Sequence, residues 1–103
     1  MKAIFECIVK FRSERNWEIF HTPENLAKSI SIEASKLLEL FQWNNDFRLG
    51  DLKNELAYVL IYSFFLAHDL GLDIEKIIND KIKLNETKYP ISRFCGKCDK
   101  HNK

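Results

Sequence analysis

The sequence has few of the residues that interrupt helices, since it contains only 3 glycines and 2 prolines among 103 residues. These residues fall between long segments, a distribution typical of a helical protein with short connections. Basic and acidic residues nearly balance, at 16 and 15, so no broad field of one sign is present to attract a nucleic acid or a membrane surface. Three cysteines cannot all pair within one chain, which argues against a disulfide framework.

Long apolar runs are also missing. The most apolar stretch, residues 56–67, is shorter than the ~20 residues that a membrane-spanning helix needs. Residues 1–7 lack the apolar run and the small-residue cleavage pattern of a secretory signal. We therefore expect a cytoplasmic protein that binds neither membranes nor nucleic acid polymers.

Hydrophobic residues make up 46% of the chain, which is enough for one modest core. Apolar residues at helical spacing predict a first helix over about residues 1–15. Thr22 and Pro23 predict the start of a second helix, because a hydroxyl residue followed by proline is typical of a helix N-terminus. The periodic pattern extends this helix to about Trp43.

A polar turn over residues 44–50 precedes the third predicted helix. Asp51 is expected to cap this helix, which runs to about His68 and closes at Gly71. Residues 56–67 are apolar nearly all round the helix, which is more than one monomeric face can hide. The third helix therefore either lies centrally or packs in a dimer.

Asp73 is expected to cap a fourth helix, which ends near Tyr89 because the residue before a proline disfavours helical geometry. Four helices with short connections predict an all-α fold, an antiparallel four-helix bundle over residues 1–90. Residues 91–103 form a polar, basic C-terminal tail.

Two acidic residues are predicted to point inward. At ~100° per residue, Glu33 falls in the middle of the apolar stripe of the second helix, with Lys36 on its shoulder, and Glu55 falls beside the apolar face of the third. A buried carboxylate costs several kcal/mol unless it finds a cation, a donor or a proton, so two of them suggest a shared partner. An ion pair between Glu33 and Lys36 within one helix is the alternative interpretation.

The fourth helix changes character along its length. Lys81, Asn85 and Lys88 continue the azimuth of apolar residues nearer its start, so its C-terminal half is predicted to face something anionic. A solvated helix end, where positive charges suit the helix dipole, would give the same pattern.

A set of short motifs occurs in a recognisable order across residues 8–90. The motifs are FRSERNW at 11–17, HTPENL at 21–26, IE at 32–33, ELFQW at 39–43, EL at 55–56, VLIY at 59–62 and KxxxNxxKYP at 81–90. Together they resemble the MazG-like, all-α nucleoside-triphosphate pyrophosphohydrolases, and most closely the small single-domain branch that includes dCTP pyrophosphatases. The resemblance implies hydrolysis of a nucleoside triphosphate, here a deoxynucleotide, to monophosphate and pyrophosphate. It also implies a homodimer or a dimer of dimers, which would complete the bundle.

The resemblance further implies a magnesium site formed by Glu-x-x-Glu on one helix and Glu-x-x-Asp on the next. Magnesium is a hard cation that prefers such oxygen ligands. The first acid of each pair is present as Glu33 and Glu55, which we expect to be catalytic and metal-binding. Lys36 and Tyr58 replace the second acids, and a protonated lysine offers no acceptor and repels the ion.

Two functions therefore stay open. The chain is either a pyrophosphohydrolase with a reduced magnesium site, or a catalytically silent nucleotide-binding or regulatory homologue in which Lys36 replaces the metal. The resemblance also implies a nucleotide pocket with aromatic residues around the base and sugar and polar residues near the phosphates. Its residues are Trp17, His21, Trp43, Tyr62, Lys81, Asn85 and Lys88.

The tail contains one further motif. Cys95, Cys98 and His101 offer three soft ligands at short spacing, whereas a structural zinc site takes about four. The motif is therefore a weak signal for zinc binding or redox chemistry.

Overall fold

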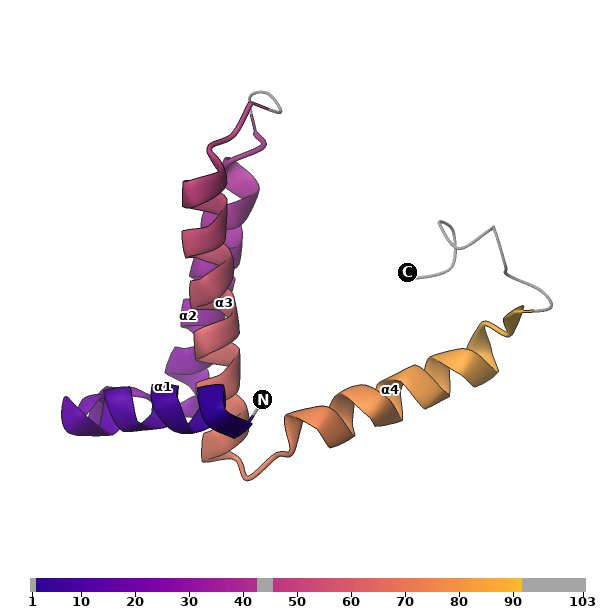
Figure 1. The fold of residues 1–103 in the computed structure, drawn as a ribbon, viewed down its shortest axis with the longest axis horizontal. Coiled ribbons are helices and arrows are strands. Elements are labelled where there is room, and N and C mark those ends of the chain that lie inside the picture. Colours follow the sequence, from indigo (N-terminus) through magenta and orange to yellow (C-terminus); the bar gives the residue numbers. More distant parts are fainter. Residues whose placement is uncertain (1, 43–45, 92–103) are drawn as a thin grey trace. The chain divides into compact units, whose positions relative to one another are not determined.

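The computed structural model describes residues 2–42 and 46–91, and these ranges contain helices and no strand (Figure 1). This observation confirms the predicted all-α class. The chain divides into two compact units, Met1–Gly71 and Leu72–Lys103. The helices are α1 (Lys2–Glu14), the 3₁₀ helix η1 (Trp17–Phe20), α2 (Pro23–Glu39), α3 (Leu49–Asp69) and α4 (Ile74–Lys88).

In the first unit, α2 and α3 lie side by side as an antiparallel pair, and α1 packs across α3 (Figure 1). The buried apolar side chains among the described residues are Leu26 from α2 and Phe65 and Ala67 from α3. These residues place the core where the three helices meet. The pair and α1 account for three of the predicted helices, while the place of α4 in a bundle and the division of the chain at residue 90 stay predictions.

The N-terminus of α2 forms as predicted. The side chain of Thr22 accepts a hydrogen bond of 3.1 Å from the backbone N–H of Asn25, and Pro23 occupies the first turn. The prediction that the helix continues to about Trp43 is wrong, because α2 ends at Glu39. The N–H groups of residues 40–42 bond to carbonyls three residues back, so the last turn tightens and does not propagate the helix.

The two ends of α3 differ in how well sequence signals locate them. The prediction that Asp51 caps the helix is wrong, since Arg48 is the extended residue before it and its carbonyl accepts from the N–H of Leu52 at 3.1 Å. Asp51 lies instead in the first turn, where a negative charge suits the helix dipole. At the other end Gly71 adopts a φ of 69°, as expected of a glycine that terminates a helix.

The second unit contains α4. The side chain of Asp73 caps it by accepting from the N–H of Lys76 at 3.2 Å, as predicted. The helix ends at Lys88, two residues before Pro90, which also agrees with the prediction.

Much apolar surface stays exposed in the described part of the chain. On α3, Leu56 and Leu60 are 42% and 49% exposed, so the surplus of apolar residues predicted for this helix is present. No single helix in the described ranges is long and apolar enough to span a membrane, and only α3 and α4 taken together meet that test of length and composition.

Candidate functional site

Glu33 on α2 and Glu55 on α3 form a carboxylate pair where these two helices pack. The Glu33 side chain is only 13% exposed, and one oxygen of each residue, Glu33 Oε1 and Glu55 Oε2, is buried without a hydrogen-bond partner. Glu33 raises the pKa of Glu55, chiefly through a hydrogen bond that the two carboxyl groups share when one is protonated, and burial adds to the effect. Both acids therefore point inward, and their free oxygens suit a proton or a cation.

Lys36 and Tyr58 each follow an acid of the pair by one helical turn. The Lys36 ammonium lies 3.5 Å from Glu33 Oε2, and its side chain is 52% exposed. The Tyr58 ring instead stacks on Tyr62 at a centroid distance of 6.2 Å. Neither residue adds a carboxylate oxygen to the pair.

A pocket of about 410 Å³ opens beside the carboxylate pair. It is lined by Lys36, Glu39, Leu40, Asp51, Asn54 and Glu55. Glu39 and Asp51 are exposed, and Asp51 contributes to raising the pKa of Glu55. The charged residues of this lining are acidic apart from Lys36, so the ammonium group competes there with any bound cation.

The donor set fits a divalent cation as a reduced site. Two unpartnered buried oxygens supply the negative charge that such an ion needs. In residues 2–42 and 46–91, however, no three acidic, histidine or cysteine side chains are arranged to hold a metal. Magnesium tolerates this shortage, because it keeps several waters and often binds through one or two carboxylates and substrate phosphates.

A second cavity, which we call the aromatic pocket, lies between α1, η1 and α3 and has a volume of about 420 Å³. It brings together Trp17, His21 and Tyr62, three of the residues predicted to bind a nucleotide. The Tyr62 and His21 rings meet edge to face at 6.2 Å, and burial raises the pKa of Tyr62. Aromatic walls of this kind suit a planar ring.

Local backbone geometry places Trp17 at the aromatic pocket. Asn16 follows α1 in the left-handed region, with a φ of 53°, which asparagine tolerates better than most residues. The chain then reverses into η1, and Trp17 packs edge to face on Phe11 at 5.6 Å. The Arg15 guanidinium lies 3.7 Å above the Phe11 ring, so a cation–π contact holds this corner.

Several predicted site residues lie in the second unit or outside the described residues. Lys81, Asn85 and Lys88 lie on α4 in the second unit, with both lysines exposed and Asn85 half-buried. Their contact with phosphates stays a prediction. Trp43, Cys95, Cys98 and His101 lie outside the described residues.

The sequence predictions missed one buried polar residue beside the aromatic pocket. Arg12 is 2% exposed and forms a bidentate ion pair with Asp69, with distances of 2.9 and 2.6 Å. A helical azimuth contains the signal, because Arg12 follows Ile8 by four residues and therefore shares its apolar stripe. A charged residue on such a stripe indicates a buried partner.

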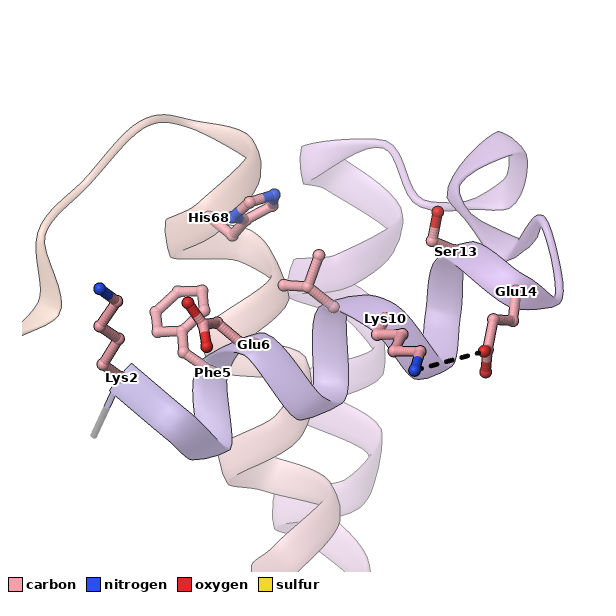
Figure 2. A pocket seen from close by; sticks show the side chains of 8 residues that line it. Lys2, Phe5, Glu6, Lys10, Ser13, Glu14 and His68 are labelled. Carbon is pink, nitrogen blue, oxygen red and sulfur yellow. Dashed lines mark ion pairs between the residues drawn. The ribbon is translucent and has the colours of Figure 1, made fainter.

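Figure 2 shows a wider hollow along α1, with a volume of about 630 Å³. Phe5 and His68 come to it from α1 and α3, and Phe5 stacks on Phe64 at 5.4 Å. Lys10 and Glu14 pair at its rim at 4.0 Å. None of the predicted site residues lines this hollow, so we assign it no ligand.

The described residues define an all-α protein with inward acids on an antiparallel helix pair, beside an aromatic pocket. The chain belongs to the MazG-like family, whose model matches residues 28–97. It is similar to dCTP pyrophosphatase 1 of Rattus norvegicus, with 34% identity over 102 residues, and to that of Homo sapiens, with 36% identity over 91 residues. These matches cover 89% and 79% of this chain and 60% and 54% of the relatives, so the chain spans little more than half of their length.

A solved structure supports the same assignment of fold. A pyrophosphatase from Archaeoglobus fulgidus superposes with a TM-score of 0.81 and 38% sequence identity. The match covers 87% of this chain and 92% of that one. At this identity and coverage the likeness confirms the MazG-like helical fold.

Proposed function

We propose that this chain is a MazG-like nucleoside-triphosphate pyrophosphohydrolase, which converts a (deoxy)nucleoside triphosphate to the monophosphate and pyrophosphate. The observation that carries the proposal is the carboxylate pair, with two buried unpartnered oxygens, in the same helical unit as an aromatic pocket. The names of the similar proteins, dCTP pyrophosphatase 1 and a pyrophosphatase, support the reaction class and a deoxynucleotide substrate.

The chain's own residues divide the work between binding and chemistry. Trp17 and Tyr62 would stack on the base, and the apolar walls around them would exclude water. Glu33 and Glu55 would hold a magnesium ion, which when bound supplies positive charge to phosphate oxygens and an activated water. Each acid has one buried oxygen without a partner in the structure, and these oxygens would be available to a cation that replaces the proton the pair can share.

A second candidate function is favoured by the position of Lys36. Its ammonium lies 3.5 Å from Glu33 Oε2, so one positive charge already neutralises part of the pair. In this alternative the protein binds a nucleotide without metal and does not hydrolyse it. Binding would then survive a chelator, whereas the pyrophosphohydrolase requires the cation for turnover.

One experiment separates the two functions. Pyrophosphate release is measured for the common deoxynucleoside and ribonucleoside triphosphates with magnesium or manganese, alongside thermal-shift binding with and without EDTA. We expect release of pyrophosphate from at least one deoxynucleotide. Binding in EDTA with no release of pyrophosphate under any condition would support the silent homologue. The absence of both nucleotide binding and pyrophosphate release would overturn both functions.

We further propose that the protein is a cytoplasmic homodimer or dimer of dimers. The exposed apolar side chains of α3, such as Leu56 and Leu60, support an interface with another copy. Sedimentation velocity over a range of protein concentrations tests this, and a single monomeric species throughout would contradict it.

A further inference from the structure

We propose that Arg12 and Asp69 are positioning residues that hold His21 in one neutral tautomer, with Nε2–H presented to the aromatic pocket as a hydrogen-bond donor. The ligand atom that meets this donor is a carbonyl oxygen on the edge of a nucleobase. This second statement rests on the proposed function, since it takes the pocket's ligand to be a nucleotide.

The contacts of Arg12 hold its side chain in place. Its guanidinium donates to both carboxylate oxygens of Asp69, at 2.9 and 2.6 Å, and lies 4.4 Å from the centre of the Phe65 ring. The side chain is 2% exposed, and it joins α1 to the end of α3. The hydrogen bond to Asp69 raises the pKa of Arg12, so the guanidinium is a fixed cation.

Arg12 decides which nitrogen of His21 carries the proton. Nη1 of Arg12 lies 3.3 Å from Nδ1 of His21. A guanidinium has donors only, so Nδ1 accepts and the proton of the neutral ring resides on Nε2. The ring is also held by Phe65 at 5.4 Å and by Tyr62 at 6.2 Å, so its plane is fixed.

The other ring nitrogen of His21, Nε2, is free to meet a ligand. Within residues 2–42 and 46–91, His21 makes its one side-chain hydrogen bond through Nδ1, and Nε2 is not among the buried atoms that lack a partner. His21 lines the aromatic pocket. The imidazole is therefore anchored at one nitrogen and open at the other.

The charges around His21 favour its neutral form. Burial, followed by the neighbouring Arg12, lowers the pKa of His21, while Asp69 and Glu18 act in the opposite direction. A protonated ring would also lose the acceptor that Nη1 of Arg12 contacts. A neutral N–H among aromatic walls is suited to an uncharged acceptor such as a base carbonyl, because leaving that donor unpaired in a filled pocket is costly.

The tautomer can be observed directly in the full chain without ligand. Long-range ¹⁵N–¹H correlation spectra distinguish the two nitrogens of each of the 3 histidines, and His21→Gln assigns the signals of His21. We expect Nδ1 to be unprotonated and Nε2 protonated at neutral pH. The reverse tautomer, or an even mixture of the two, would overturn the proposal.

Arg12→Lys tests whether Arg12 sets that tautomer, because lysine keeps the charge but loses the planar fork. We expect the His21 signals to move toward a mixture of tautomers. Arg48→Lys, a change at the exposed start of α3, is the matched control and should leave them unchanged. Asp69→Asn provides a second route if Arg12→Lys does not fold, because it loosens the anchor of Arg12. Unchanged His21 signals in folded Arg12→Lys would overturn the role of Arg12, and unchanged signals in folded Asp69→Asn would overturn the role of Asp69.

The donor itself is tested with two amide variants and dCMP, which binds without being turned over. In the variant His21→Gln, the amide nitrogen of the glutamine reaches the position of Nε2. In His21→Asn the side chain is shorter, and its amide nitrogen reaches only the position of Nδ1. We expect the glutamine variant to bind dCMP within about threefold of the natural protein and the asparagine variant to bind roughly tenfold more weakly, which is the loss of one hydrogen bond. Equal affinities for the two variants would overturn the donor role.

Deoxyribose 5-phosphate lacks the base and should not distinguish the two amide variants. Discrimination between them with this ligand would assign the donor to the sugar or phosphate and overturn the base-carbonyl assignment. Failure of dCMP to bind the natural protein would overturn the ligand half of this inference, whereas the proposed function is decided by the screen for pyrophosphate release. The tautomer spectra would still decide the Arg12 half by themselves.

Discussion

The carboxylate pair and the aromatic pocket share the helix α3 but are completed to different degrees. In the aromatic pocket, rings stack on one another and His21 is anchored by a buried ion pair, so its walls exist before any ligand arrives. In the carboxylate pair, two buried oxygens have no partner, and the neighbouring cation is Lys36, which lies on α2 with Glu33. The comparison indicates that the pocket proposed to bind the base is already built, whereas the site proposed to hold the metal has two of the four acids that the family resemblance implies.

The largest expected effect comes from breaking the ion pair behind the aromatic pocket. Asp69→Ala leaves the guanidinium of Arg12 buried without its carboxylate, which should cost about 3–5 kcal/mol of unfolding free energy. Chemical denaturation followed by circular dichroism measures it. Glu14→Ala removes the partner of Lys10 in an exposed pair on α1 and should cost less than ~1 kcal/mol. Similar losses of unfolding free energy for Asp69→Ala and Glu14→Ala would show that the buried ion pair does not stabilise the aromatic pocket in the absence of ligand.

Adding the two acids that the family resemblance implies at positions 36 and 58 should complete the carboxylate pair as a metal site. The double change Lys36→Glu and Tyr58→Asp adds two oxygen ligands and removes a positive charge, so metal-dependent pyrophosphate release should rise by about 100-fold, equivalent to ~2.7 kcal/mol of barrier. Lys28→Glu, on the same helix and paired with Glu24, is the control and should have no such effect. An unchanged rate of pyrophosphate release would mean that the acids missing at positions 36 and 58 are not what limits the carboxylate pair.

Low pH should weaken the ion pair between Arg12 and Asp69 behind the aromatic pocket. The hydrogen bond from Arg12 lowers the pKa of Asp69, so its contribution to stability is present above the unfolded-state pKa of about 3.9 and is lost as pH falls through the folded-state value. The unfolding free energy should therefore decline below about pH 4 by less than the Asp69→Ala cost, since a protonated Asp69 still accepts one hydrogen bond. Asp69→Asn should flatten this part of the pH profile, and a profile identical to that of the natural protein would contradict the assignment.

The smallest effect is expected from relieving the carboxylate pair. Because Glu33 raises the pKa of Glu55, the contribution of Glu55 to stability is present below the unfolded-state pKa and is lost as pH rises through the folded-state value. Glu55→Gln should therefore raise the thermal midpoint slightly in EDTA at neutral pH, and remove any stabilisation by added magnesium. A lower midpoint in EDTA would show that the pair is not under strain.

Sequence periodicity located the inward acids because each lies on a regular helix, where azimuth follows from spacing alone. Glu33 and Glu55 are both placed correctly by this count. The same count cannot find Asp69, since its partner Arg12 is 57 positions away in the chain and comes close only when α1 packs on α3. Long-range pairs of this kind depend on packing, which local pattern does not contain.

Helix ends were less predictable than helix faces. Asp51 is a good capping residue, yet α3 begins two residues earlier because Arg48 is extended and leaves Leu49 free to start the helix. The end of α2 depends on a switch to tighter hydrogen bonds after Glu39, which apolar spacing does not reveal. Caps with a side-chain acceptor at the observed boundary, Thr22 and Asp73, were located correctly.

The replacement of two acids by Lys36 and Tyr58 has a consequence at the level of the gene. Every lysine codon becomes a glutamate codon, and every tyrosine codon an aspartate codon, by changing its first nucleotide. The four-acid arrangement implied by the family resemblance is therefore two point mutations away, on helices whose backbones already hold the first acids inward. A population under selection for nucleotide cleavage could recover these acids without insertion, deletion or refolding of the chain.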